Sequence, residues 1–153
     1  MRRRLRSRHR AGVLASTELI FVLPILIYVA LIVMQFIATY AAYQRVQMAA
    51  IEGASIASAG GTMNNVEDAV GLALGHLASG GFEATRQYVD EDGNAAINSM
   101  TDHVVVGVRI PMNRVITNYL GLLGGGVDQL QIRSVVKQKL KVNIPGPPYD
   151  GGP

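Results

Sequence analysis

The side chains that could carry acid–base or metal chemistry in this sequence are few and far apart. The three histidines are His9, His76 and His103, and no acids lie beside them at metal-ligand spacing. The chain has no cysteine, which excludes a disulfide framework, thiol catalysis and a thiolate metal site. We therefore predict neither a metal nor another cofactor.

Two glycine-containing stretches resemble ligand loops but lack the residues that such loops need. In "DEDGN", residues 90–94, the glycine follows Asp90 by three positions rather than five, and no glutamate occupies the twelfth place of a calcium loop. In "GGG", residues 124–126, the lysine and the serine or threonine of a phosphate loop are missing. We interpret the first stretch as a turn rather than a calcium site. Because no catalytic cluster is present either, the sequence predicts a protein that is not an enzyme.

One carboxylate, Glu18, has an unusual position at the front of a long apolar run. From Leu19 to Met34 the chain has no charge and no amide, and only Gln35 and Thr39 interrupt the run as far as Tyr43. As a helix, these 25 residues would extend roughly 37 Å at about 1.5 Å each, enough to cross a hydrocarbon core of about 30 Å. We predict a transmembrane helix over residues 13–43, bent at Pro24 and anchored at its outer end by tyrosines.

A basic leader, residues 1–12, precedes this run. Arginines in such a position hold the cytoplasmic side of a membrane span, and this leader has six of them: Arg2, Arg3, Arg4, Arg6, Arg8 and Arg10. A nucleic-acid-binding arm is the alternative, which the apolar segment directly after the leader disfavours. A cleaved signal peptide would have an apolar region of only about 7–15 residues and a small-residue cleavage site. We expect a single-pass protein of the inner membrane whose span is not removed by a signal peptidase, with its N-terminus in the cytoplasm and its C-terminal domain in the periplasm.

The residues after the span predict a small α+β domain over residues 44–142. The first helix continues outward along a stripe of small residues to "AGG" at 59–61, and this stripe is suited either to its own domain or to a partner subunit. A second helix is predicted over 66–79, capped by Asn64 with Glu67. The domain is thus helical over 44–79 and rich in strands over 82–142, with strands expected at 82–89, 103–111 and 130–144. The tail, residues 143–153, is too rich in proline and glycine to fold.

The predicted fold class is therefore membrane-anchored α+β. A long N-terminal transmembrane helix continues outward, a second helix follows, and both pack on an antiparallel sheet of about three strands. In the last strand apolar residues alternate with cations, which predicts one buried face and one cationic face. The apolar residues are Leu130, Ile132, Val136, Leu140 and Val142, and the cations are Arg133, Lys137, Lys139 and Lys141.

The order of these features resembles the TadE-like family of pilin-related membrane proteins. The segment "ELIFVLP", Glu18 to Pro24, is similar to the family's "E-F-x-L-V-L-P", and "AAIEGA", Ala49 to Ala54, is similar to its "A-A-x-E-G-A". The later segment "VVVGVRIPMNRVITNYLGLLGGG", Val104 to Gly126, resembles the family's valine strand, proline and Leu-Gly-Leu stretch. The resemblance covers residues 10 to about 142.

The resemblance implies a minor pilin or pseudopilin that helps to assemble Flp-type pili, or the associated secretion system, for surface adhesion. Its implied partners are the lipid bilayer, other pilin-like subunits, the inner-membrane assembly platform and a prepilin peptidase. That peptidase would cut between Gly12 and Val13, which leaves Glu18 sixth in the mature chain where the pilin pattern has fifth. Glu18 would then pair with the new amino terminus of a neighbouring subunit, and Glu18 and Pro24 would be the residues of helix assembly.

One further interpretation stays open beside the pilin. The chain could be a single-pass, membrane-anchored binding or structural protein unrelated to pili, in which the apolar helix is only a tether. In that case Glu18 is an interfacial acid, hydrated among the lipid headgroups near Arg10.

Overall fold

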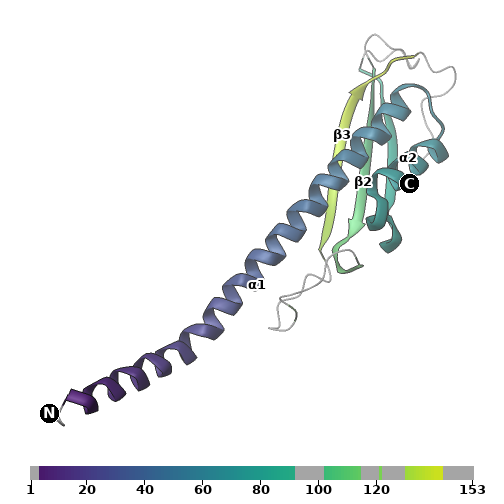
Figure 1. The fold of residues 1–153 in the computed structure, drawn as a ribbon. Coiled ribbons are helices and arrows are strands. Elements are labelled where there is room, and N and C mark those ends of the chain that lie inside the picture. The colour runs from purple at the N-terminus through teal and green to yellow at the C-terminus, as the bar shows by residue number, and fades with distance from the viewer. Residues whose placement is uncertain (1–3, 92–101, 115–120, 122–129, 143–153) are drawn as a thin grey trace.

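The computed structural model describes residues 4–91, 102–114, 121 and 130–142, and gives the backbone alone for residues 4–18 and 114. Two α-helices come first, α1 (Arg4–Ser58) and α2 (Met63–Leu74), and the 3-10 helix η1 (Gly75–Gly80) follows directly. The strands are β1 (Glu83–Val89), β2 (His103–Pro111) and β3 (Gln131–Lys139), with the short 3-10 helix η2 (Met112–Arg114) after β2. Figure 1 shows α1 as a long rod with the other elements gathered at its C-terminal half.

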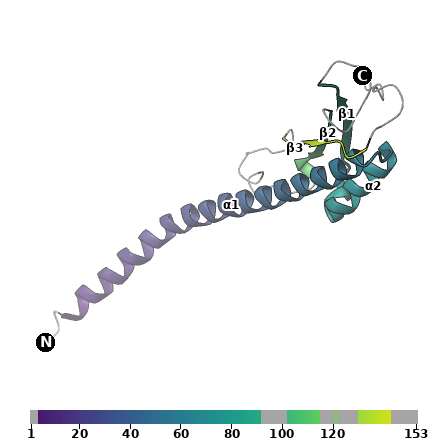
Figure 2. The ribbon, with the colours of Figure 1, turned by 90° about the horizontal axis from the view of Figure 1, so that it is seen from above.

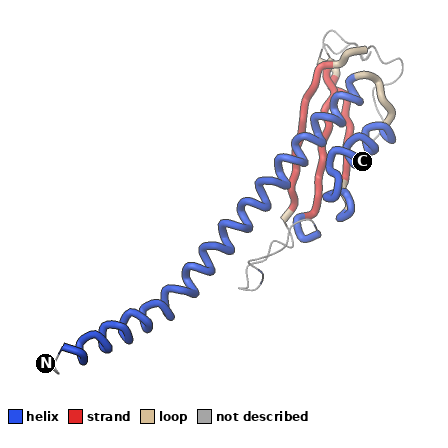
Figure 3. Tube along the Cα trace, viewed as in Figure 1, coloured by secondary structure: helices blue, strands red, loops and turns tan. Residues whose placement is uncertain are grey.

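The domain is a two-layer arrangement of helices on a sheet. The three strands are antiparallel in the order β1-β2-β3, with Thr85, Gly107 and Val135 side by side across the register. α1 lies over β2 and β3, and α2 packs beside α1 (Figures 2 and 3). The predicted long apolar N-terminal helix, second helix and three-stranded antiparallel sheet are confirmed.

The core forms between the central strand and the two helices. β2 alternates in burial except at Gly107, which is also buried. Its inward side chains are fully buried: Val104, Val106, Val108 and Ile110. Opposite them lie Val66, Val70 and Leu74 of α2. The predicted strand 103–111 is confirmed at both ends, because an alternating β-branched run favours a half-buried strand and little else.

The first helix is a single piece from the basic leader to the domain. The helix continues through Pro24 without a break. Its N-terminal part is curved (Figure 2). Its small residues Val46, Ala49, Ala50, Ala54 and Ala57 are all fully buried against the rest of the chain. The small-residue stripe therefore packs on its own domain, which settles the alternative left open above.

The boundaries of the second helix differ from the prediction. Its cap is Thr62, whose Oγ1 accepts a hydrogen bond from the backbone N–H of Asn65 at 3.4 Å, and not Asn64 with Glu67. The helix ends at Leu74 because Gly75 has a positive φ of 59°, which leaves the helical region. The residues up to Gly80 form the tighter 3-10 turn η1 instead of the predicted α-helix to Ser79.

The third strand is shorter than predicted. Residues 130–144 were expected, whereas β3 ends at Lys139. Leu130 and Val142, predicted to be on the buried face, are 53% and 40% exposed, while Ile132 and Leu140 are buried as expected. The predicted tail, residues 143–153, lies outside the described residues, as does most of the stretch between η2 and β3.

Candidate functional site

Over residues 19–34, α1 has an apolar surface that the described part of the chain leaves largely uncovered. Every side chain from Leu19 to Ala30 is exposed, and Phe21 and Phe36 have exposed fractions of 72% and 73%. In the described part of the chain this is the one helix that is long and apolar enough to cross a membrane, and a signal sequence would share these properties. A core helix of a globular protein would instead be mostly covered.

The selected residues that the structure describes belong to the N-terminal part of this helix. Gly12, Val13 and Glu18 are part of α1, whose backbone is continuous there, and so are Arg4, Arg6, Arg8 and Arg10. Arg2 and Arg3 lie outside the described residues. Glu18 and Pro24 are therefore about 9 Å apart along the helix axis, at about 1.5 Å per residue. The structure brings none of the described elements near them.

The apolar half meets the domain at a polar residue. Burial on α1 begins at Gln35, which is 6% exposed, and continues through Ala42 to Val46. The hydroxyl of Thr39 donates to the backbone carbonyl oxygen of Gln35 at 2.8 Å, so the Thr39 side chain is hydrogen-bonded within the helix. The junction between the exposed and the buried halves of α1 thus falls between residues 35 and 42.

A pocket of about 490 Å³ opens at this junction, and sequence reasoning did not find it. It lies between α1, the start of η2 and the N-terminal end of β3. Its floor is apolar, formed by the buried Met112 and Ile132. Side chains with polar ends surround the floor: Thr39, Tyr40, Tyr43, Gln131 and Arg133. Tyr40 and Tyr43, predicted to be an aromatic anchor, are exposed here.

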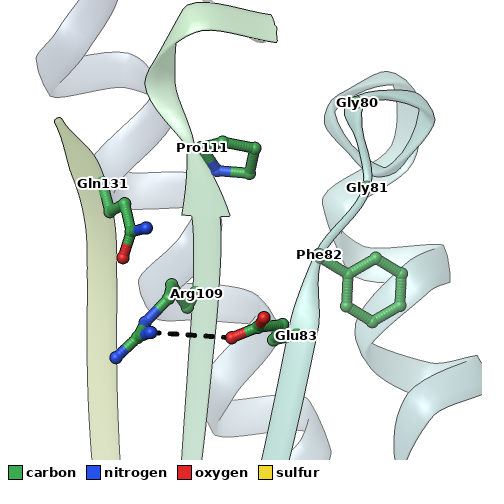
Figure 4. Close-up of a pocket in the computed structure, with 7 residues that line it drawn as sticks. All are labelled: Gly80, Gly81, Phe82, Glu83, Arg109, Pro111 and Gln131. Atoms are coloured by element: carbon green, nitrogen blue, oxygen red, sulfur yellow. Dashed lines mark ion pairs between the residues drawn. The ribbon is translucent and has the colours of Figure 1, made fainter. Parts of the chain in front are cut away.

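Two arginines lie side by side next to this pocket on the outer face of the sheet. Arg109 of β2 and Arg133 of β3 are directly opposite in the register. Arg109 Nη1 is 3.6 Å from Glu83 Oε2 on β1, a pair that Figure 4 shows beside a smaller pocket of about 280 Å³. Arg133 has no carboxylate partner within the described part of the chain. The predicted cationic face of β3 is therefore present, and Arg133 of this face lines the pocket at the junction.

A second charged group lies at the opposite end of the sheet. Glu91 accepts a hydrogen bond from Lys137 and lies 3.2 Å from Nδ1 of His103. The hydrogen bond from Lys137 lowers the pKa of the Glu91 carboxyl below 4.5, and the charges of His103 and Lys137 add to this. The sequence alone did not predict that the Glu91 carboxylate lies beside the His103 ring. Over residues 4–91, 102–114, 121 and 130–142, no three histidine, aspartate or glutamate side chains come together as a metal site.

Comparisons with protein-family models, with curated proteins and with solved structures found no match for this chain.

Proposed function

We propose that this chain is a TadE-like minor pilin or pseudopilin, a non-enzymatic subunit that helps to assemble Flp-type pili or the associated secretion system for surface adhesion. One observation carries the proposal. A single continuous helix is apolar and largely exposed over residues 19–34, and its C-terminal half packs in the core of a folded domain. Such a helix needs lipid or other apolar helices around one half while the other half stays folded in water.

This continuity also favours an uncleaved span over a signal peptide. The small residues after the apolar run, at 41–42, are the nearest approach to a signal-peptidase site. Cleavage there would separate the span from Val46 and the following core residues of the same helix. The six arginines of the leader support an N-terminus in the cytoplasm and a domain in the periplasm.

Within this proposal, the leader and Glu18 serve assembly. A prepilin peptidase cuts between Gly12 and Val13, and the carboxylate of Glu18 pairs with the amino terminus of a neighbouring pilin-like subunit. An acid at the edge of an apolar region is costly by itself, and a cationic amine offsets that cost only when the two helices are in register. The inner-membrane assembly platform is the second class of partner.

The alternative is a membrane-anchored binding or structural protein unrelated to pili. It is favoured by the same bare helix, because a tether needs no more than an apolar span. The two proposals differ in what the N-terminal end does, since only a pilin-like subunit needs a cut leader and a helix that contacts other subunits.

The test is deletion of the gene in the organism that encodes the chain, followed by electron microscopy of surface pili. We expect the deletion to remove pili and surface attachment, and the wild-type gene to restore both. The intact mass of the membrane-extracted protein, measured with and without the prepilin peptidase, tests processing at Gly12. Normal piliation in the deletion strain, with an intact mass that starts at Met1 in both backgrounds, would support the tether instead.

A further inference from the structure

We propose that the pocket at the junction of α1 and the sheet binds an anionic phospholipid of the surrounding bilayer, with Arg133 holding the headgroup phosphate. This inference rests on the membrane insertion of α1 in the proposed function. It follows from three properties of the pocket: its position along the helix, its lining and its charge.

The position along the helix places the pocket in the headgroup layer. If the hydrocarbon core of about 30 Å begins after Glu18, about 20 helical residues bring α1 to Ala38 at the outer boundary. Tyr40 and Tyr43 then lie within the headgroup layer, which adds about 5–8 Å on each side of the core. Arg133 lines the same pocket as these two tyrosines, so the pocket that it borders lies at the depth of the lipid phosphates.

The lining matches a molecule that is apolar at one end and polar at the other. Phe36 is on the membrane side of the pocket, and Met112 and Ile132 form its apolar floor. The hydroxyls of Tyr40 and Tyr43 offer hydrogen-bond donors to a phosphate oxygen at the rim. The volume of about 490 Å³ is within the range of about 300–1,000 Å³ that is typical of small-molecule pockets.

The charge favours an anion. Like charges directly opposite in a sheet destabilise it, and Arg109 and Arg133 form such a pair. Glu83 offsets only one of the two, since its carboxylate pairs with Arg109 (Figure 4). A phosphate at Arg133 balances the second charge, and the planar guanidinium binds phosphate through two parallel hydrogen bonds.

The experiment uses the full chain in nanodiscs of phosphatidylcholine with a minor fraction of phosphatidylglycerol. Spin-labelled forms of the two lipids are compared for their association with the protein by electron paramagnetic resonance. We expect the wild type to prefer phosphatidylglycerol and Arg133→Gln to reduce this preference about fivefold, the effect of one cation near a lipid surface. Arg133→Lys should reduce the preference less than Arg133→Gln, because the positive charge remains while the two parallel hydrogen bonds of the guanidinium are lost.

Lys139→Gln is the matched control, since it removes the same charge from the same face of β3. Six residues of strand separate the two positions by about 20 Å, well beyond the screening length of about 8 Å, so this variant should leave the preference unchanged. Glu83→Gln should raise the preference, because Arg109 is then released toward the phosphate. All variants are compared with the wild type by circular dichroism for an unchanged fold.

The outcomes separate this inference from the proposed function. A chain that stays in the nanodisc but shows no preference for phosphatidylglycerol overturns the lipid site alone. The same applies if Lys139→Gln lowers the preference as much as Arg133→Gln, because general attraction would then explain it. A chain that does not remain with the bilayer overturns membrane insertion and the lipid site together.

Discussion

Gly53 of α1 faces Val70 of α2 so closely that a Cβ atom at position 53 would lie 2.7 Å from Cγ2 of Val70. Two further methyl groups, from Val106 and Val66, would be 3.3 and 3.4 Å from the same atom. The absent side chain therefore sets how near the two helices approach each other and the central strand. Gly53 belongs to the motif "AAIEGA" on which the family resemblance rests, so at this position the motif has a packing role within the domain.

We expect Gly53→Ala to destabilise the domain. Replacing a helical glycine with alanine favours the helix by about 1 kcal/mol, whereas overpacking a core costs about 1–3 kcal/mol. The cost should exceed the gain, because Val70 is fully buried and its β-branched side chain has one strongly preferred rotamer in a helix. Equilibrium unfolding of the full chain in detergent measures the change.

Gly71→Ala is the matched control for this substitution. Gly71 is also inside a helix, and its added Cβ would meet only Phe82, at an ordinary contact distance of 3.5 Å. Because the added Cβ does not overpack the core here, only the higher helix propensity of alanine changes the stability. We expect stabilisation of up to about 1 kcal/mol. A Gly53→Ala protein as stable as Gly71→Ala would contradict the close packing of α1 on α2.

The elements that sequence reasoning predicted best are those whose pattern is decided locally. The apolar run of α1 and the alternating valines of β2 each favour one structure over their whole length. The cap of α2 shows the limit of local reasoning, since Thr62 and Asn64 are both good capping residues and lie two positions apart. Which of the two caps α2 depends on the path of the chain after Gly61, and in the structure it is Thr62.

The candidate site was harder to predict because its residues come from distant parts of the chain. The pocket joins Tyr40 and Tyr43 to Ile132 and Arg133, about ninety positions later, and only the packing of α1 on β3 brings them together. In β1 the alternation has polar residues on both faces, so the pattern does not show that Arg86 points toward the helices. Its partner, the Gly61 carbonyl, lies 25 positions away.

We expect Arg86→Met to destabilise the domain by about 1.5–3 kcal/mol, the range for a hydrogen bond to a charged group. Nη1 of Arg86 donates to the Gly61 carbonyl oxygen at 2.5 Å, just beyond the C-terminal end of α1, and the guanidinium lies 5.1 Å from the centre of the Tyr88 ring. Methionine keeps an unbranched apolar side chain in place of the arginine's aliphatic part but cannot donate a hydrogen bond. Urea unfolding of the full chain in detergent measures the loss.

Gln87→Met provides the control for Arg86, since it introduces the same side chain at the next position of β1, where the side chain is exposed. Its effect should stay within about 0.5 kcal/mol. Equal losses in the two variants would mean that the hydrogen bond to Gly61 contributes nothing to the stability of the domain.

The charged group formed by Glu91, Lys137 and His103 predicts that the stability of the domain depends on pH. The pKa of Glu91 is lowered below 4.5 in the folded protein, mainly by the hydrogen bond from Lys137. Because this pKa is lower in the folded than in the unfolded protein, the ionised Glu91 contributes to the free energy of unfolding. This contribution is fully present above pH 4.5 and is lost as the pH falls through the folded pKa. We therefore expect the wild type to be more stable than Glu91→Gln at pH 6, and the difference to vanish toward pH 3.

The pH prediction is measured as the difference in unfolding midpoint between wild type and variant at each pH. Glu67→Gln is the control, because Glu67 is an exposed acid on α2 without a cationic partner in the described part of the chain. It should leave the pH profile unchanged in shape. A difference for Glu91→Gln that is constant from pH 6 to pH 3 would exclude the ion pair as its source.

The last prediction concerns the acid at the front of the apolar run. Glu18→Gln keeps the size and hydrogen-bonding capacity of the side chain but removes the charge that the proposed pairing with a neighbouring amino terminus requires. Membrane insertion should be unchanged, since the apolar run is intact, whereas co-purification with pilin partners and the number of pili should fall. Glu52→Gln, which neutralises an exposed acid on the domain half of the same helix, should affect neither. If Glu18→Gln assembled pili as well as Glu52→Gln, Glu18 would be an ordinary interfacial acid and α1 would need no charge to find its register.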